Sequence, residues 1–164
     1  ISFKKKQVNL KDMSKSNGLI LAGGGDIYKY NKIGINKIRD EYEKKLFKFF
    51  LKKNKPILLI CRGFQLIADL YGIKLQKIKN HVRKFHSLKI DRSKYIKDKS
   101  LKVNSYHNYC IKDLPKNFIK VSNTKDGSIE IAEHKSKKIL CLMFHPERKM
   151  KSKKNILKSI KIFF

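Results

Sequence analysis

The chain has 164 residues, which is enough for one domain around a single hydrophobic core. Hydrophobic residues make up 41% and exclude a disordered tail, while 41 Lys and Arg against 13 Asp and Glu give a net charge of +28. This excess predicts attraction to phosphates and other anions, but it does not specify a nucleic-acid binder.

The three cysteines are too far apart for a disulfide framework or a metal finger. No apolar run approaches the ~20 residues that span a bilayer. We therefore expect a cytoplasmic protein with a single domain over residues 1–164, and we expect no metal ion, no cofactor and no membrane contact.

Strand and helix signals alternate along the first half. After a short strand expected near residues 7–10, an apolar run at 18–22 ends in glycines, as a buried strand does when it breaks into a loop. Apolar residues recur at helical spacing over 35–53. A second apolar run at 56–60 is typical of a parallel strand buried on both faces, and a helix that ends at Gly72 follows it. This β-α-β-α order predicts an α/β domain with a mainly parallel sheet.

The second half is richer in short strands. We expect them at residues 87–90, 101–104, 118–121, 129–132 and 139–144, and a closing helix through 156–162. These strands would extend the parallel sheet or form an antiparallel addition to it.

Cys61 stands where the second predicted strand turns sharply into a helix. A residue at such a turn lies at the top of the sheet beside a helix N-terminus, where N–H groups and the helix dipole favour negative charge. A thiol there is expected to have a lowered pKa and to act as a nucleophile, and Gly63 lets helix and strand pack closely. The alternative is a buried structural cysteine at the end of a strand.

His145 and Glu147 follow the last predicted strand and flank a proline. A cysteine nucleophile needs a base that takes its proton, and that base needs a carboxylate that fixes its tautomer. The pattern therefore predicts a triad of Cys61, His145 and Glu147.

Four sequence blocks resemble the class I glutamine amidotransferase superfamily, and most of all its stand-alone γ-glutamyl hydrolase branch, the C26 peptidase group. They occur in the order of the family, at residues 19–27, at 39–43 with 56–66, at 103–107 and at 144–147. The resemblance implies a flavodoxin-like, doubly wound, mostly parallel sheet with antiparallel additions and a site at its carboxyl edge.

The resemblance also implies a role for each site residue. Cys61 would attack a γ-glutamyl amide and form a thioester, while His145 moves the proton and Glu147 orients His145. The oxyanion would be bound by backbone N–H groups of Arg62 and of the glycine loop. The residues implied to hold the glutamyl group are Gln65, Ser105, Tyr106 and His107.

Two departures from the family pattern stand out. Leu59 replaces the glycine that the family has two residues before the nucleophile, which puts a bulky side chain where strand and helix crowd. Family domains also have a further strand and helix before the glycine loop. We expect these to be absent here, which would leave a hydrophobic sheet edge unless residues 1–17 cover it.

Other polar residues are expected to have structural roles. His81, Arg83 and His86 resemble a substrate-loop segment, but a solvated loop is the favoured alternative, and His134 is expected on the surface. Glu130 and Glu133 are alternative partners for the base, but they belong to an earlier strand. Cys110 is expected to be a small core residue.

Three functions remain open on the sequence. The first is a hydrolase of small γ-glutamyl compounds, and the last two blocks resemble a sub-branch that cleaves γ-glutamyl nucleotide amidates such as γ-glutamyl-CDP-amidate. There Arg148, with Arg62 and Arg83, would attract the diphosphate. The second is an ammonia-donating subunit whose partner is a separate synthetase, and a homodimer is also open. The third is a basic nucleic-acid binder on an inactive scaffold, although dispersed lysines argue against a specific nucleic-acid site.

Overall fold

The computed structural model describes residue 13 and residues 15–164, so the strand expected near residues 7–10 lies outside this part. In chain order its elements are β1 (Leu19–Leu21), α2 (Gly34–Lys52), β2 (Ile57–Ile60), α3 (Arg62–Leu70), β3 (Gln76–Lys77), β4 (Val82–Lys89), β5 (Ser100–Tyr106), β6 (Tyr109–Cys110), β7 (Phe118–Asn123), β8 (Ile129–His134), β9 (Ile139–Leu142) and α4 (Lys153–Phe163). Each element predicted within this part is present. The short strands β3 and β6 were not predicted.

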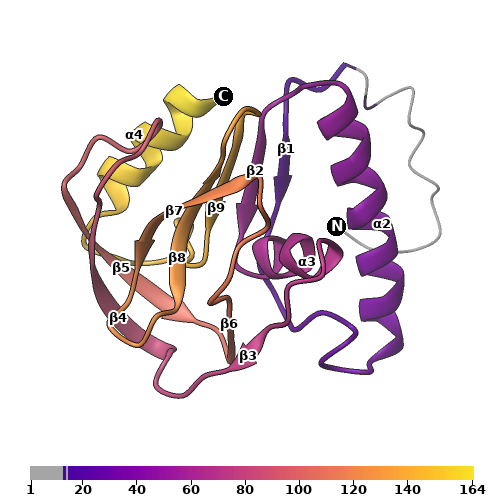
Figure 1. Ribbon diagram of the computed structural model, residues 1–164, viewed down its shortest axis with the longest axis horizontal. Coiled ribbons are helices and arrows are strands. Elements are labelled where there is room, and N and C mark those ends of the chain that lie inside the picture. The colour runs from indigo at the N-terminus through magenta and orange to yellow at the C-terminus, as the bar shows by residue number, and fades with distance from the viewer. Residues whose placement is uncertain (1–12, 14) are drawn as a thin grey trace.

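The central sheet has five strands in the order β1-β2-β9-β8-β7 (Figure 1). β1, β2 and β9 are parallel, whereas β8 and β7 pair in antiparallel fashion. The strands β4 and β5 form a separate antiparallel hairpin, and β3 pairs with β6. This confirms a parallel sheet with antiparallel additions.

Helices cover both faces of this sheet. The beginning of α3 presses against the backbone of Leu21 on one face, and α2 packs beside α3. On the other face, Leu157 and Ile160 of α4 line a cleft together with Ile20 of β1 and Leu58 of β2. Figure 1 shows α2 and α4 on opposite sides of the sheet, as expected for a doubly wound fold.

The buried stripe of α2 differs from the apolar stripe that its sequence suggests. Its buried residues are Asp40, Glu43, Phe47 and Phe50, whereas Ile38 is 60% exposed. The helix was predicted correctly, but two carboxylates occupy the part of its inner face nearest the site. Buried carboxylates need partners, and these are Arg39 on the same helix, Arg62 at the start of α3 and the Tyr28 N–H.

The sheet core is almost entirely aliphatic. All four residues of β2 and all four of β9 are buried, and Leu59 has no exposed surface. Within the described part of the chain, no helix is long and apolar enough to cross a membrane.

Candidate active site

Cys61 occupies a strained turn between β2 and α3. Its φ of 47° and ψ of −101° lie outside the regions that side-chain-bearing residues normally adopt, and such strain is common at functional sites. A Cβ atom at Gly63 would come within 2.5 Å of the Leu21 carbonyl oxygen, so only glycine allows α3 to begin this close to β1. The close approach predicted at Gly63 is confirmed, and Leu59 is accommodated within the sheet.

Three loops meet at the carboxyl ends of the parallel strands. β2 and β9 are neighbours, and the Cys61 N–H donates to the Leu142 carbonyl at 2.7 Å. His145 follows three residues later, and its ring lies so close to Gly23 that a Cβ atom at residue 23 would overlap it. The glycine loop after β1, the turn at Cys61 and the His145 loop therefore share one edge of the sheet.

His145 and Glu147 form the expected pair. Nδ1 of His145 lies 2.6 Å from Oε1 of Glu147, so the carboxylate accepts the Nδ1 proton and leaves Nε2 with a free lone pair. Burial tends to raise the pKa of Glu147, but the hydrogen bond from His145 and the charge of Arg148 hold it below its usual value. Glu147 is therefore ionised at neutral pH.

The alternative carboxylates bind elsewhere. Glu133 accepts hydrogen bonds from the Ser93 hydroxyl and from the Lys94 N–H, the latter at 3.0 Å. Glu130 accepts from the Ser128 hydroxyl at 2.9 Å and lies beside His107. Neither acid occupies the position at His145 Nδ1.

A buried asparagine that the sequence analysis did not single out holds the loop of the base. The Asn104 side chain accepts from the His145 N–H at 2.9 Å and donates to the His145 carbonyl at 2.8 Å. Asn104 lies on β5 and has no exposed surface. An asparagine in a buried strand position was the available signal, because a buried amide must find partners.

The thiol of Cys61 is protonated at rest. Burial raises its pKa from 9.0 to about 12, and the charges of Glu130 and Glu147 act in the same direction. The hydrogen bond from the Arg62 N–H and the charge of Arg148 oppose this rise without cancelling it. The lowered pKa expected at the helix N-terminus is therefore wrong, because desolvation outweighs the dipole.

An ion network that is buried at Arg62 and partly exposed at Arg39 supports both the glycine loop and the turn at Cys61. Arg39 on α2 donates to the carbonyls of residues 22, 23 and 24 at 3.2, 3.2 and 2.9 Å. The Nε group of Arg39 donates to Glu43 at 2.7 Å, and the second oxygen of Glu43 accepts from Arg62. The other terminal nitrogen of Arg62 donates to Asp40, whose second oxygen accepts the Tyr28 N–H at 2.8 Å.

This network determines which backbone groups can face a substrate. Gly24 and Gly25 have φ values of 112° and 64°, which side-chain-bearing residues rarely adopt. Arg39 on α2 holds this loop by hydrogen bonds to its carbonyl groups. The Arg62 side chain is fully buried, so this residue reaches the site through its backbone N–H. The oxyanion roles of Gly24, Gly25 and Arg62 stay predictions.

The residues expected to bind substrate lie in two places. Tyr106 lies edge-on to the His145 ring at 5.8 Å between centroids, and the Arg148 guanidinium lies 4.2 Å above the Tyr106 ring. Arg148 is exposed beside the cleft described below. These two residues are therefore next to the base.

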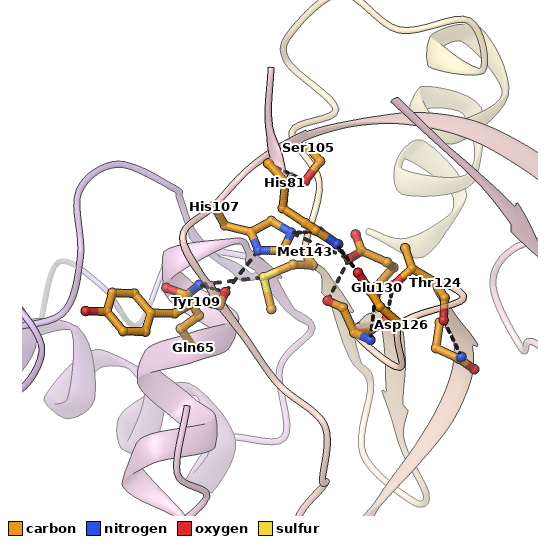
Figure 2. Close-up of polar contacts among 11 residues, drawn as sticks. Gln65, His81, Ser105, His107, Tyr109, Thr124, Asp126, Glu130 and Met143 are labelled. Atoms are coloured by element: carbon orange, nitrogen blue, oxygen red, sulfur yellow. Dashed lines mark hydrogen bonds and ion pairs between the residues drawn. The ribbon is translucent and has the colours of Figure 1, made fainter. Parts of the chain in front are cut away.

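The other three residues are buried, and each bonds to a group of the protein. Gln65 donates to the Tyr109 carbonyl at 2.8 Å, and the Ser105 hydroxyl donates to the His81 carbonyl at 2.6 Å (Figure 2). His107 also bonds to the Tyr109 carbonyl, at 3.0 Å. Their predicted contacts with substrate stay predictions.

A cleft of about 420 Å³ opens beside the glycine loop and the base. Its polar end contains Gly23, Gly24, His145, Glu147 and Arg148. Its apolar end continues between the sheet and α4, where Ile20, Leu58, Ile60, Leu157 and Ile160 line it. Such a cleft would fit a ligand whose polar reacting group lies at the polar end and whose larger, non-reacting part extends toward α4.

Two expectations about the remaining histidines are wrong. His81 is 1% exposed and its ring contacts the side chains of His107 and Asp126, so it does not lie in a solvated loop. His134 is 6% exposed and its Nδ1 accepts the N–H groups of Ser136 and Lys137. Cys110 is fully buried, as expected of a small core residue.

Known proteins are similar to this chain in sequence and in fold. The peptidase C26 family model matches residues 2–147. Gamma-glutamyl-CDP-amidate hydrolase of Campylobacter jejuni is 35% identical over 130 residues, which are 79% of this chain and 62% of that protein. A subunit of the glutamine-hydrolysing GMP synthase of Methanosphaera stadtmanae is 35% identical over 134 residues, covering 79% of this chain and 64% of its own length.

The fold comparison agrees with the sequence comparison. The crystal structure of a glutamine amidotransferase from Thermotoga maritima matches with a TM-score of 0.69 at 21% identity, over 97% of this chain and 67% of that one. The chain spans less than two thirds of the length of the two curated relatives. It belongs to the peptidase C26 family within the class I glutamine amidotransferases.

Proposed function

We propose that this chain hydrolyses γ-glutamyl amide bonds with Cys61 as its nucleophile. One observation carries the proposal: the strained turn at Cys61 and the His145–Glu147 pair lie at the carboxyl ends of adjacent parallel strands. A protonated thiol beside a base that is fixed by a carboxylate is the arrangement that acyl transfer needs.

In the proposed first step, Nε2 of His145 takes the proton from the Cys61 thiol as the sulfur attacks the γ-carbonyl carbon. The raised pKa of the thiol, about 12, makes this transfer unfavourable before substrate binds, so the base must act during attack. The negative charge on the carbonyl oxygen is stabilised by the N–H of Arg62 and by the glycine loop.

In the proposed second step, the tetrahedral intermediate collapses and its carbon–nitrogen bond breaks. His145 returns the proton to the departing nitrogen, which leaves as an amine, an amidate or ammonia. Water, deprotonated by His145, then attacks the resulting thioester and releases glutamate and the free thiol. Glu147 stabilises the imidazolium that forms in each half of the cycle.

An electrophilic diazoketone analogue of glutamine tests the proposal directly. The full chain should be labelled on Cys61, as mapped by peptide mass spectrometry, and should release nitroaniline from γ-glutamyl-4-nitroanilide. Cys110→Ala is the matched control and should be labelled like the wild type. Labelling that persists in Cys61→Ala, or that maps to Cys110, would refute the assignment.

We further propose that the substrate is a γ-glutamyl amidate of a nucleotide. The relative from Campylobacter jejuni bears the name of a hydrolase of such a compound. In this chain the Arg148 guanidinium lies over the Tyr106 ring beside the cleft, so its N–H donors would be available to bind a phosphate. The net charge of +28 would attract a diphosphate to this opening.

Steady-state kinetics distinguish this substrate class from glutamine. We expect kcat/KM for γ-glutamyl-CDP-amidate to exceed that for glutamine by orders of magnitude. Arg148→Ala should raise KM for the amidate and leave KM for glutamine unchanged. Equal kcat/KM values for the two compounds would exclude the nucleotide and retain a general γ-glutamyl hydrolase.

The similarity to a GMP synthase component favours a second candidate, in which the chain is the ammonia-donating glutaminase of a larger enzyme. Such a glutaminase would hydrolyse glutamine only when a separate synthetase chain is bound. Its signature would be glutaminase activity that rises on addition of the synthetase, whereas a hydrolase acts alone, as a monomer or a homodimer.

A cytoplasmic location fits the unpaired Cys61, Cys110 and Cys141, because thiols stay reduced there.

A further inference from the structure

A cluster of buried ionisable side chains lies on the far side of β5 from the base. It joins His81, which precedes β4, His107, which follows β5, and Glu130 on β8 (Figure 2). The three residues are at most 3% exposed. Neither the proposed thiol chemistry nor the pairing of His145 uses them.

Each imidazole is held in one tautomer by an oxygen atom that can only accept a hydrogen bond. His107 Nδ1 lies 3.0 Å from the Tyr109 carbonyl oxygen, so this nitrogen carries the hydrogen and Nε2 has the lone pair. His81 Nε2 lies 2.8 Å from a carboxylate oxygen of Asp126, so Nε2 carries the hydrogen and Nδ1 has the lone pair. This is how metal-binding histidines are held by their outer partners.

The two lone pairs and one carboxylate oxygen converge on a single point. His81 Nδ1 and His107 Nε2 are 3.3 Å apart, and Glu130 Oε1 lies 3.5 Å from the latter and 3.9 Å from the former. Three acceptors at these distances repel one another unless a proton or a metal ion lies between them. Among the described residues, the second oxygen of Glu130 is buried and has no hydrogen-bond partner.

The spacing matches the coordination sphere of zinc. Bonds of about 2.0–2.1 Å in a tetrahedral site place neighbouring ligand atoms about 3.3–3.4 Å apart. The observed separations of 3.3, 3.5 and 3.9 Å need only small side-chain movements to reach this geometry. Two imidazoles and a carboxylate are also a ligand set that zinc binds, with a fourth position for water.

We propose that His81, His107 and Glu130 form a binding site for one divalent transition-metal ion, for which zinc is the best fit. The ligands come from sequence positions 23 and 26 residues apart, so their spacing shows no metal motif in the sequence. This site runs against our expectation that the protein has no metal ion.

The bound ion would join the β4–β5 hairpin to the central sheet. His81 and His107 flank the two ends of the hairpin that pair with each other, whereas Glu130 belongs to the sheet. β5 also carries Asn104 and Tyr106, which contact His145. The ion would thus fix the hairpin that supports the base, without contacting the reacting atoms.

The test uses the full chain without an affinity tag, stripped of metal by a chelator and titrated with Zn²⁺ or Co²⁺. We expect one ion per chain, a rise in melting temperature with Zn²⁺, and the visible absorption bands of tetrahedral Co²⁺. The near-ultraviolet band of cobalt–thiolate bonds should be absent, because no cysteine is among the ligands. Binding of less than one ion per chain, or a thiolate band, would overturn the proposal.

Variants locate the site. Glu130→Gln and His107→Gln each remove one ligand and should weaken Zn²⁺ binding by at least ~100-fold, whereas Asp126→Asn, which changes an outer partner, should weaken it ~10–100-fold. His134→Ala is the matched control, since it removes a buried histidine outside the cluster, and should bind like the wild type. If the ligand variants do not fold, two measurements still test the proposal. They are the Zn²⁺ affinity of Asp126→Asn, whose side chain is half-exposed, and the cobalt spectrum of the wild type. Unchanged affinity in Asp126→Asn and Glu130→Gln would mean that a shared proton holds the cluster together.

Discussion

Replacing Glu43 by glutamine removes one negative charge from the buried network behind Cys61 and leaves the size of the side chain unchanged. Glu43 accepts hydrogen bonds from Arg39 and Arg62, so it links the residue that holds the glycine loop to the residue that follows the nucleophile. The variant keeps a carbonyl oxygen that can serve only one of these two arginines well. The other arginine would face the NH2 group of the glutamine, and both arginines lose the negative charge of Glu43.

The expected cost follows from the burial of Arg62. Its side chain is fully buried, and removing one partner of a buried ion pair typically destabilises a protein by about 3–5 kcal/mol. Asp40 still neutralises Arg62 in the variant, so we expect the lower end, about 3 kcal/mol. In a chain of this size each kcal/mol lowers the melting temperature by ~2–4 °C, which predicts a decrease of about 6–12 °C.

The assay compares urea unfolding with the rate at which the glutamine analogue labels Cys61. Glu41→Gln is the matched control, because it removes the same charge from the exposed face of the same helix. It should change the unfolding free energy by less than about 0.5 kcal/mol. Glu43→Gln should also label more slowly under conditions where it is fully folded, since the glycine loop is held less firmly.

Two results would refute this reasoning. If Glu43→Gln unfolds at the same urea concentration as Glu41→Gln, the network contributes no stability. If the folded variant labels Cys61 at the wild-type rate, the network does not position the loop, and its role is confined to folding.

Four further predictions can be tested with the same protein. Asn104→Ala leaves the buried N–H of His145 without its partner and should cost about 1–3 kcal/mol in urea unfolding and lower kcat, whereas the exposed Asn108→Ala should change neither. Gly23→Ala pushes the His145 ring aside and should lower kcat about 10²-fold; an unchanged kcat would contradict the close contact. With a pKa of about 12 against 9.0, the Cys61 thiolate fraction is about a thousandfold below that of an ordinary thiol, so alkylation by iodoacetamide should keep accelerating above pH 9 instead of levelling off. DNA binding should be weak, independent of sequence and lost steeply as salt rises, and a sequence-selective complex at physiological salt in a mobility-shift assay would contradict this.

The sequence allowed most of the fold to be predicted because its strongest signals are local. Apolar runs such as Ile57–Ile60 are strands buried on both faces, and a parallel sheet follows from their alternation with helices. The inner face of α2 was predicted less well. Its helical spacing is clear, but Ile38 faces solvent while Asp40 and Glu43 are buried, because Arg62 compensates their charge from another element.

In the site, too, residues that belong to local motifs were predicted, whereas residues that depend on distant partners were not. Cys61, His145 and Glu147 stand at the ends of strands and could be proposed from motif and spacing alone. Asn104 and the partners of Arg62 could not, because their roles depend on residues that lie up to 41 positions away in the chain. The pKa of the thiol was also mispredicted, since the helix terminus is visible in the sequence and the burial of Cys61 is not.

Loops at the edge of a sheet are mobile by default, yet acyl transfer needs its reacting groups held within about 0.5 Å. In this chain polar side chains resolve the conflict, with the buried Asn104 bound to both backbone groups of His145 and the partly exposed Arg39 bound to the glycine loop. An apolar side chain could fill either space but could not determine where a backbone N–H points. Substitutions at these supports should therefore reduce turnover before they unfold the domain, and the ratio of lost kcat to lost stability should be larger there than at Phe47 or Leu59 in the aliphatic core.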